Sequence, residues 1–330
     1  MTGTMHALVL DGPGAPFRLE SMPIPQPGPG EVLVRIHASG VNPLDLKIAA
    51  GEARHARHPL PAILGLDMAG TVEATGSGVT RFAVGDAVYG MTGGVGGIQG
   101  SLAEYAAVDA DLLALKPALL SMREAAALPL VAITAWEGLV DRAGVRMGEA
   151  VLVHGGAGGV GSIAIQIARA LGAEVHATGR AGHAAAIREA GAVPIDFESE
   201  TVADYVAAHT AGRGFDLVYD TLGGATLDAS FEAVRRAGRV VSCLGWGTHS
   251  LAPLSFKNAS YAGVFTLLPL LTGEGRQHHG EILASVARLA AEGQIRPRID
   301  ARAFDLGAAA EAYESLGSRR NDGRVVIDLV

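Results

Sequence analysis

Residues 150–161, AVLVHGGAGGVG, join a short apolar run to a glycine-rich turn, and they decide the fold. The run AVLVH is typical of a buried strand, and the turn follows it directly. Beyond the turn, residues 160–171 carry apolar side chains at the spacing of one helix face. A strand, a glycine turn and a helix in this order predict an α/β unit with a parallel sheet.

The turn itself matches the pattern G-x-G-x-x-G at Gly156, Gly158 and Gly161. The first glycine permits a tight turn, the second lets the backbone approach a pyrophosphate, and the third allows the helix to pack closely on the strand. Unpaired amides at the helix start can then hold the anion. A turn that only reverses the chain is the alternative. The predicted binding residues here are Gly156, Ala157, Gly158, Gly159, Val160 and Gly161.

The segments after the turn repeat the alternation of strand and helix, which favours dinucleotide binding over simple chain reversal. Strands are expected at 174–178, 194–197, 216–220 and 239–244, and helices near 184–190, from 202, and near 226–236. Such alternation predicts a doubly wound parallel sheet with helices on both faces. A last helix at 281–291 and a closing strand at 324–329 complete the chain.

The first part of the chain has a different pattern. Strand-like runs at 7–10, 31–36 and 70–74 are bounded by glycine or proline, which indicates a β-rich domain. Ser121 and Glu124 then resemble a capping box that opens a helix carrying Ala125, Ala126 and Leu128. Because 330 residues exceed the usual size of one hydrophobic core, two domains are expected.

Composition excludes several classes of protein. A formal charge of −8 argues against nucleic acid as a partner, because such binding needs a surplus of Lys and Arg. The most apolar stretch, 262–271, contains Pro269 and is far shorter than the ~20 residues that cross a bilayer, so no membrane span is expected. The start of the chain lacks the features of a signal peptide, which predicts a cytoplasmic protein. Cys243 is the single cysteine, so no internal disulfide is possible.

The end of the second strand indicates which dinucleotide binds. An Asp or Glu there would hydrogen-bond a free ribose 2′-hydroxyl, but the residues are TGRAGH at 178–183. Arg180 is suited to pair with a 2′-phosphate, although a solvated loop arginine is the alternative. NADPH is therefore the expected cofactor, and its contacts in this segment are Thr178, Gly179, Arg180 and His183.

A zinc site is not expected. Catalytic zinc needs three protein ligands from Cys, His or carboxylates around an open position. The histidines at 55 and 58, and those at 278 and 279, lack an obvious third ligand and are interpreted as exposed loop residues. Without a Lewis acid, reactions that spread negative charge over a conjugated system are favoured.

Five segments together resemble the zinc-free quinone oxidoreductases of the medium-chain dehydrogenase/reductase superfamily, from Met5 to Leu329. They are 40–47 (GVNPLDLK), 65–70 (GLDMAG), 84–90 (VGDAVYG), 152–161 and 215–224. Zinc-binding relatives have His-Glu after the glycine that corresponds to Gly65, whereas this chain has Leu66 and Asp67 there. The resemblance implies a GroES-like β domain from 1–127 and 266–330, an inserted Rossmann domain from 128–265, nicotinamide at the base of a cleft, and a homodimer.

The resemblance also implies roles for individual residues. Asn42 would lie near the nicotinamide and the substrate, unless it only forms a turn before Pro43. Lys47 stands where bacterial quinone reductases often have tyrosine and enone reductases often have lysine, which favours α,β-unsaturated carbonyl substrates; a surface lysine is the alternative. Further implied cofactor contacts are Thr134, Thr221, Leu222, Leu244, Gly245, Trp246, Phe265 and Arg324, while Met91 and Trp246 would shape the substrate pocket.

The sequence thus predicts an NADPH-dependent oxidoreductase that transfers hydride to a quinone or to the conjugated C=C of an enone, with Asn42 and Lys47 as catalytic residues and no metal. Two alternatives remain. One is a reductase restricted to quinones. The other is a non-catalytic NADPH-binding protein that serves as a sensor or structural component.

Overall fold

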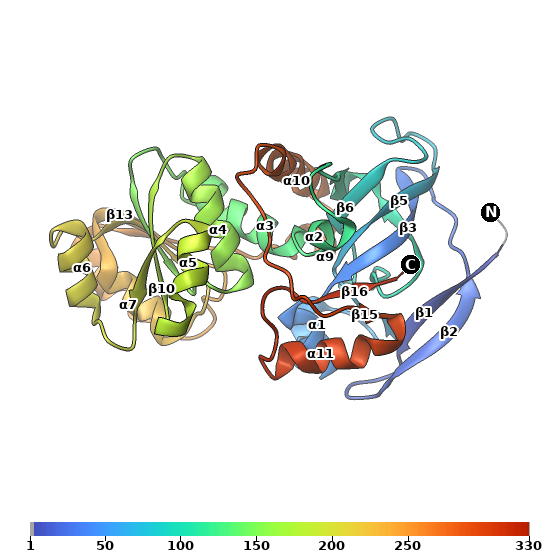
Figure 1. The fold of residues 1–330 in the computed structure, drawn as a ribbon, viewed down its shortest axis with the longest axis horizontal. Coiled ribbons are helices and arrows are strands. Elements are labelled where there is room, and N and C mark those ends of the chain that lie inside the picture. The colour runs from blue at the N-terminus through green and yellow to red at the C-terminus, as the bar shows by residue number, and fades with distance from the viewer. Residues whose placement is uncertain (1–2, 330) are drawn as a thin grey trace. The chain divides into compact units, whose positions relative to one another are not determined.

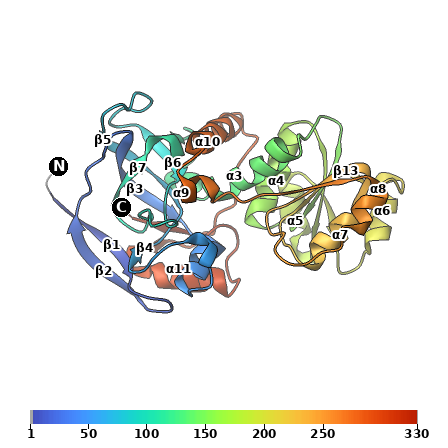
Figure 2. The same cartoon turned by 180° about the vertical axis from the view of Figure 1, so that it is seen from behind.

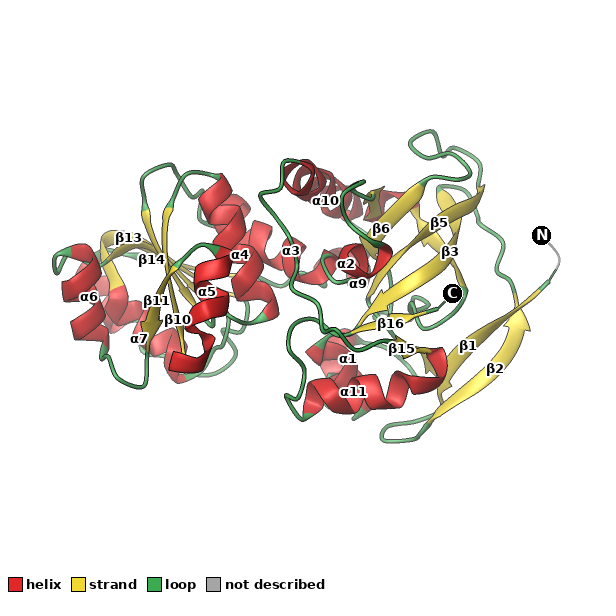
Figure 3. Cartoon of the chain, in the orientation of Figure 1, coloured by secondary structure: helices red, strands yellow, loops and turns green. Residues whose placement is uncertain are grey.

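The computed structural model describes residues 3–329 and divides into two compact units. Unit 1 comprises Met1–Leu130 with Leu267–Val330, and unit 2 comprises Val131–Thr266. Figure 3 shows that strands dominate unit 1, whereas helices and strands alternate in unit 2. The boundary falls within helix α3 (Pro129–Trp136).

Unit 1 is built on two sheets. The smaller has the order β2-β1-β4, and the larger has the order β15-β16-β3-β5-β6-β8, with β7 also pairing with β3. The strands are β1 (Thr4–Leu10), β2 (Phe17–Pro23), β3 (Glu31–Gly40), β4 (Ala62–Ile63), β5 (Asp67–Thr75), β6 (Ala87–Met91), β7 (Tyr105–Asp109), β8 (Leu113–Leu115), β15 (Phe304–Asp305) and β16 (Val326–Asp328). The apolar side chains of β3 and β5 are buried and form the centre of this core.

Unit 1 also contains helices, whose lengths range from five residues to 16. They are α1 (Pro43–Ala49), α2 (Met122–Ala126), α9 (Leu268–Thr272), α10 (Arg276–Ala291) and α11 (Ala309–Gly317), with 3₁₀ turns η1 (Arg54–Ala56), η2 (Ala110–Leu112) and η5 (Leu306–Ala308). The capping box is present, because Glu124 N–H donates to Ser121 Oγ at 3.2 Å. The helix that follows ends at Ala126, so Leu128 lies outside it.

Unit 2 is a six-stranded parallel sheet in the order β11-β10-β9-β12-β13-β14. Its strands are β9 (Ala150–His154), β10 (Glu174–Gly179), β11 (Val193–Asp196), β12 (Phe215–Asp220), β13 (Val234–Ser242) and β14 (Ser260–Gly263). Its helices are α4 (Gly159–Ala170), α5 (Ala184–Ala190), α6 (Val202–Thr210), α7 (Ala225–Ala233) and α8 (Ala252–Lys257), with η3 (Glu137–Arg142) and η4 (Ala181–His183). Figures 1 and 2, from opposite sides, show α4 and α5 on one face of the sheet and α7 on the other. The α/β class is confirmed.

Several element boundaries differ from the sequence predictions; the strand expected at 239–244, for example, is β13 and begins at Val234. The helix expected to reach Arg236 ends at Ala233, because Lys257 Nζ binds the last carbonyls of α7 and the buried Val234 already pairs with Phe215 in the sheet. Helix α10 begins earlier than 281, and β16 is shorter than 324–329. His279 was expected in an exposed loop but is fully buried within α10.

Candidate functional site

The glycine turn after β9 has a backbone that excludes side chains. A Cβ atom on Gly161 would lie 2.1 Å from the carbonyl oxygen of Gly155, and one on Gly156 would lie 2.6 Å from Ala177 Cβ. Gly158 N–H donates to Gly155 O at 2.9 Å, which closes the turn immediately before α4. The Cβ contacts at Gly156 and Gly161 would both be closer than a real Cβ tolerates, so glycine is required at these two positions.

The turn lies where the strand order reverses. From β9 the chain continues outward to β10 and β11, then returns to the other side of β9 through β12, with Asp220 opposite His154 in register. In open α/β sheets this switch point, at the carboxyl ends of the strands, is where ligands bind. Apart from Thr134, every residue of unit 2 that is predicted to contact the dinucleotide lies at or just after the carboxyl end of a strand. These residues are the turn after β9, Thr178, Gly179, Arg180 and His183 at β10, Thr221 and Leu222 after β12, Leu244, Gly245 and Trp246 after β13, and Phe265 after β14.

Buried polar side chains hold the turn from within the sheet. Thr178 Oγ1 lies 3.0 Å from His154 Nδ1 and accepts a hydrogen bond from Gly155 N–H at 3.3 Å. Thr221 Oγ1 donates to the His154 carbonyl at 2.6 Å. Burial lowers the pKa of His154 to about 4, so its ring is neutral near pH 7. Thr178 is thus a buried support of the turn, and Thr221 joins it to the end of β12.

Asp220 organises the neighbouring loop, and the sequence interpretation missed it. Its carboxylate is fully buried and accepts hydrogen bonds from Leu222 N–H at 3.1 Å, Gly223 N–H at 3.0 Å and Ser242 Oγ at 2.7 Å. These bonds tie the loop after β12 to β13. The sequence signal that could have identified Asp220 is an acidic residue that ends an apolar strand shortly before two glycines.

The side chains beside this loop are apolar and open to solvent. Leu222 and Trp246 are 53% and 54% exposed, while Leu244 and Phe265 are each 39% exposed. The rings of Trp246 and Phe265 meet edge to face, with centroids 6.3 Å apart. Neighbouring exposed apolar side chains are a common mark of a ligand surface. Thr134, by contrast, is buried with its Oγ1 3.1 Å from Thr266 Oγ1.

Arg180 is placed by the structure at the open end of β10, next to an acidic residue. Its side chain is 63% exposed, and its Nε lies 3.1 Å from Glu198 Oε1. An exposed pair of this kind contributes only about 0–1 kcal/mol, so Arg180 can exchange Glu198 for another anion at small cost. His183 is exposed on η4, and a Cβ added to Gly179 would lie 3.3 Å from the Cβ of His183.

In unit 1, Asn42 and Arg324 belong to one buried cluster with Asp67. Arg324 Nη2 donates to Asn42 Oδ1 at 2.6 Å, and Asn42 Nδ2 donates to Asp67 Oδ2 at 3.0 Å. Arg324 Nε also donates to Ala127 O at 3.1 Å, and Leu130 N–H donates to Asp67 Oδ1 at 2.9 Å. Asn42 is 0% exposed and both ends of its amide are engaged, so its side chain does not face solvent in this structure.

A second carboxyl adjoins the cluster at the start of α1. Asp45 is fully buried, and its Oδ2 accepts a hydrogen bond from Asn42 N–H at 2.8 Å. Burial raises the pKa of Asp45 to about 8 and the pKa of Asp67 to about 7, against the pull of Arg324. The pair of carboxyls therefore holds a proton near neutral pH. The sequence analysis assigned neither residue to the site, although Asn42 and Asp45 have the spacing of a helix-capping pair.

The other two residues predicted in unit 1 have contrasting environments. Lys47 is exposed on α1, and its ammonium has no hydrogen bond or ion pair with any other residue in the range 3–329. Met91 is 0% exposed at the end of β6. Lys47 is thus available to a ligand, whereas Met91 is a core residue of unit 1 as this structure stands.

The side chains present do not fit a zinc ion. Across residues 3–329, no group of three or more His, Cys, Asp or Glu side chains is placed to bind a metal ion. Burial raises the pKa of the single thiol, Cys243, to about 12, which disfavours the thiolate that zinc requires. Leu66, next to Asp67, is buried and offers no donor. Within the same residues, no helix combines the length and the apolar character needed to cross a membrane.

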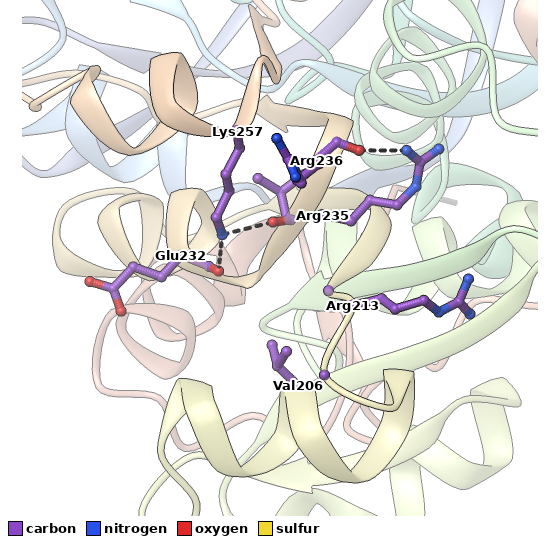
Figure 4. Close-up of a pocket in the computed structure, with 9 residues that line it drawn as sticks. Val206, Arg213, Glu232, Arg235, Arg236 and Lys257 are labelled. Carbon is purple, nitrogen blue, oxygen red and sulfur yellow. Dashed lines mark hydrogen bonds between the residues drawn. The ribbon is translucent and has the colours of Figure 1, made fainter.

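A pocket at the opposite end of the unit 2 sheet is lined by four cationic side chains, of which Lys257 and Arg235 make bonds within the unit (Figure 4). It has a volume of about 500 Å³ and adjoins Gly214 before β12 and Val234 at the start of β13. Lys257 Nζ donates to the carbonyls of Phe231, Glu232 and Val234, and Arg235 pairs with Asp216. Lys257 and Arg235 are thus engaged within the unit, and Lys257 stabilises the end of α7.

Comparisons with known proteins agree with this architecture. Residues 28–118 match the alcohol dehydrogenase GroES-like domain, and residues 191–327 match a family described as zinc-binding dehydrogenase. The chain is 35% identical, over 94% of its length and 75% of the other, to a 2-methylene-furan-3-one reductase from Solanum lycopersicum. The chain belongs to the medium-chain dehydrogenase/reductase superfamily. Among the similar proteins, one is named as a reductase, one as an NAD-dependent alcohol dehydrogenase and one as a quinone oxidoreductase.

Solved structures give the same result. An alcohol dehydrogenase superfamily protein from Novosphingobium aromaticivorans is 58% identical, with a TM-score of 0.97 over 99% of this chain and 100% of the other. A quinone oxidoreductase from Coxiella burnetii is 29% identical, with a TM-score of 0.83 over 99% and 100%. The chain also matches two Streptomyces polyketide synthase components at 34% identity, but it spans only 14% and 8% of their lengths.

Proposed function

We propose that this protein is an NADPH-dependent reductase of α,β-unsaturated carbonyl compounds or quinones that works without zinc. The observation that carries the proposal is the combination of a glycine turn shaped for a dinucleotide with side chains that do not suit a metal. When bound, NADPH supplies a hydride from C4 to the β-carbon of an enone or to a quinone. The similarity to a furanone reductase and to a quinone oxidoreductase supports both substrate classes.

Lys47 is the residue proposed to meet the substrate oxygen. Its ammonium is exposed and carries no acidic partner within residues 3–329, so it is free to stabilise negative charge that develops on an enolate oxygen. A preorganised donor of this kind contributes on the order of 3 kcal/mol to a transition state. The proton that completes the reduction comes from Lys47 or from water. Asn42, at the start of the same helix, is proposed to hold this region in place from inside the core.

The preference for NADPH is assigned to Arg180. The guanidinium is suited to a bidentate contact with a 2′-phosphate, and no carboxylate ends β10 to hydrogen-bond a free 2′-hydroxyl. Glu198 is a competing partner that a phosphate has to displace. The exposure of both side chains keeps that competition weak.

We also propose that the protein forms a homodimer. Strand β14 is an edge of the unit 2 sheet, and its Tyr261 is 38% exposed. Phe256, on the preceding helix, is 85% exposed. An open edge with exposed apolar residues beside it favours pairing with a second copy. Light scattering on the eluted protein should give twice the 33.7 kDa chain mass, whereas a monomer mass would contradict the dimer.

The experiment that tests the function measures NADPH oxidation by the purified protein with quinones, enones, acrylates and simple ketones, alongside its metal content. Oxidation with enones or quinones, without bound zinc, is the expected result. Oxidation with quinones alone would narrow the function to quinone reduction. Stoichiometric zinc required for activity would overturn the proposal. NADPH binding without acceptor-dependent oxidation would identify a non-catalytic protein.

A further inference from the structure

The pocket at the amino ends of β12 and β13 lies wholly within unit 2, at the end of the parallel sheet opposite the glycine turn. Its volume of about 500 Å³ is in the range of small-molecule sites. Four lining side chains are cationic and one is acidic, namely Arg213, Arg235, Arg236 and Lys257 against Glu232. Because the whole chain has a formal charge of −8, this surplus of cations is a local feature of an acidic protein.

Two of the four cations hold the wall of the pocket. Lys257 Nζ donates to three main-chain carbonyls at the end of α7 and the start of β13, which uses all of its N–H groups. Arg235 Nε donates to Asp216, and its Nη1 donates to the carbonyl oxygen of Arg236 at 2.6 Å. These bonds fix the wall from within unit 2, so the pocket keeps its shape without a bound molecule.

The other two cations have no partner of their own. Arg213, between α6 and β12, and Arg236, on β13, are exposed, and neither guanidinium has a hydrogen bond or ion pair within residues 3–329. Figure 4 shows the Arg213 side chain and the Glu232 carboxylate extending in opposite directions. An anion can therefore bind both arginines without displacing a carboxylate, in contrast to Arg180, which is already paired.

A distorted stretch of backbone presents the paired arginines of β13. In the pairing of these two strands, β13 advances from Val234 to Arg239 while β12 advances only from Phe215 to Leu217. The extra residues form a bulge, in which Ala237 has a φ of 53°. This left-handed conformation is costly for a residue with a side chain, and such conformations cluster at functional sites. The bulge places two consecutive arginines at the pocket wall.

We propose that this pocket binds a small organic phosphate, held by the guanidinium groups of Arg213 and Arg236. Planar guanidinium groups bind phosphate oxygens through paired, charge-assisted hydrogen bonds. The apolar side chains of Val206 and Val234 also line the pocket and suit the carbon part of such a molecule. Binding here is independent of the proposed reductase activity, because every lining residue belongs to unit 2.

Phenyl phosphate is a suitable probe, because it joins a phosphate group to an apolar ring. Isothermal titration calorimetry on the full chain measures its dissociation constant, with and without saturating NADPH. We expect a dissociation constant on the order of 100 μM that NADPH changes by less than about 2-fold, since the glycine turn is at the other end of the sheet. Benzyl alcohol, which keeps the ring and lacks the charge, should bind at least about 10-fold more weakly.

Three variants assign the binding to this pocket. Arg213→Gln and Arg236→Gln each remove one unpaired guanidinium and leave the wall intact, because Arg236 contributes only its carbonyl oxygen to the wall. We expect each to weaken phenyl phosphate by about 10-fold and to keep the wild-type melting temperature. Arg188→Gln, at an exposed position on α5 of the same unit, controls for the loss of one positive charge and should bind like wild type.

Four results would overturn the assignment. The first is wild-type protein that shows no binding of phenyl phosphate up to about 10 mM. The second is displacement of the probe by NADPH, which would place it at the glycine turn instead. The third is equal affinity for benzyl alcohol, which would show that the phosphate group is not recognised. The last is a folded Arg236→Gln protein that binds the probe as tightly as Arg188→Gln does.

Discussion

In unit 2, the residues assigned to the dinucleotide mostly lie on open turns after parallel strands, whereas in unit 1 Asn42 and Arg324 belong to a buried polar cluster. The first region is shaped by backbone: Gly156 and Gly161 leave no space for a side chain. The second is shaped by side chains, since Asn42 and Asp67 are fully buried and satisfy each other. Backbone shape leaves a recognisable sequence motif, but a side-chain cluster of distant residues does not.

The largest effect is expected where the backbone has least space. Gly161→Ala places a Cβ 2.1 Å from Gly155 O, so the turn has to open. We expect NADPH to bind roughly 100-fold more weakly and the protein to lose about 1–3 kcal/mol of stability. Fluorescence titration and thermal melting measure the two effects. Gly12→Ala, where a Cβ meets no atom within 4 Å, is the matched control, and equal behaviour of the two variants would contradict a backbone-shaped site.

Lys47 tests whether unit 1 supplies chemistry as well as structure. Lys47→Met removes the exposed ammonium from α1, and we expect kcat to fall about 100-fold while the NADPH dissociation constant stays within about 2-fold. Lys47→Arg keeps the charge and should retain more of the turnover. Steady-state kinetics with the best acceptor gives the result. Unchanged turnover in Lys47→Met would remove this side chain from the mechanism.

Arg180 and Glu198 test the open edge of unit 2 with a smaller effect. Arg180→Ala should weaken NADPH by about 10-fold and leave NADH nearly unchanged, because only NADPH carries the 2′-phosphate. Glu198→Gln removes the competing carboxylate 3.1 Å from Arg180 and should tighten NADPH by about 2–3-fold. Parallel titrations with both dinucleotides separate the two effects. An equal loss for NADH and NADPH in Arg180→Ala would show that this arginine does not select the phosphate.

The smallest effect concerns the buried carboxyls of unit 1. Burial raises the pKa of Asp45 from 3.8 to about 8, so the folded protein binds a proton that the unfolded chain releases above pH 4. Stability from this residue is therefore greatest at low pH, declines as pH rises from about 4 to about 8, and then levels off.

Asp45→Asn keeps an oxygen for Asn42 N–H and removes this titration. Melting temperatures between pH 5 and pH 9 should fall less in the variant than in wild type, by a few degrees at the alkaline end. Asp86→Asn, at an exposed loop carboxylate, should follow the wild-type curve. Parallel curves for wild type and Asp45→Asn would show that Asp45 is ionised throughout.

The local sequence patterns of the chain were sufficient to predict its fold. Residues 150–161 predicted strand, turn and helix because each depends on short-range terms: apolar spacing, glycine conformations and the start of a helix. The strand β9 and the helix α5 lie at the predicted residues. The end of α7 was predicted too late, since Lys257 from a later helix binds the Phe231 and Glu232 carbonyls of α7. These bonds join residues 26 and 25 positions apart and leave no local signal.

Tertiary structure alone decided how the candidate residues are used. The sequence by itself determined the α/β class, the glycine turn and the superfamily, because these depend on neighbours along the chain. It did not show that Arg324 and Asn42, 282 residues apart, share one hydrogen bond, or that Asp67 completes their cluster. Hydrogen bonding between distant segments, and the burial that raises a carboxyl pKa, exist only after the chain has folded.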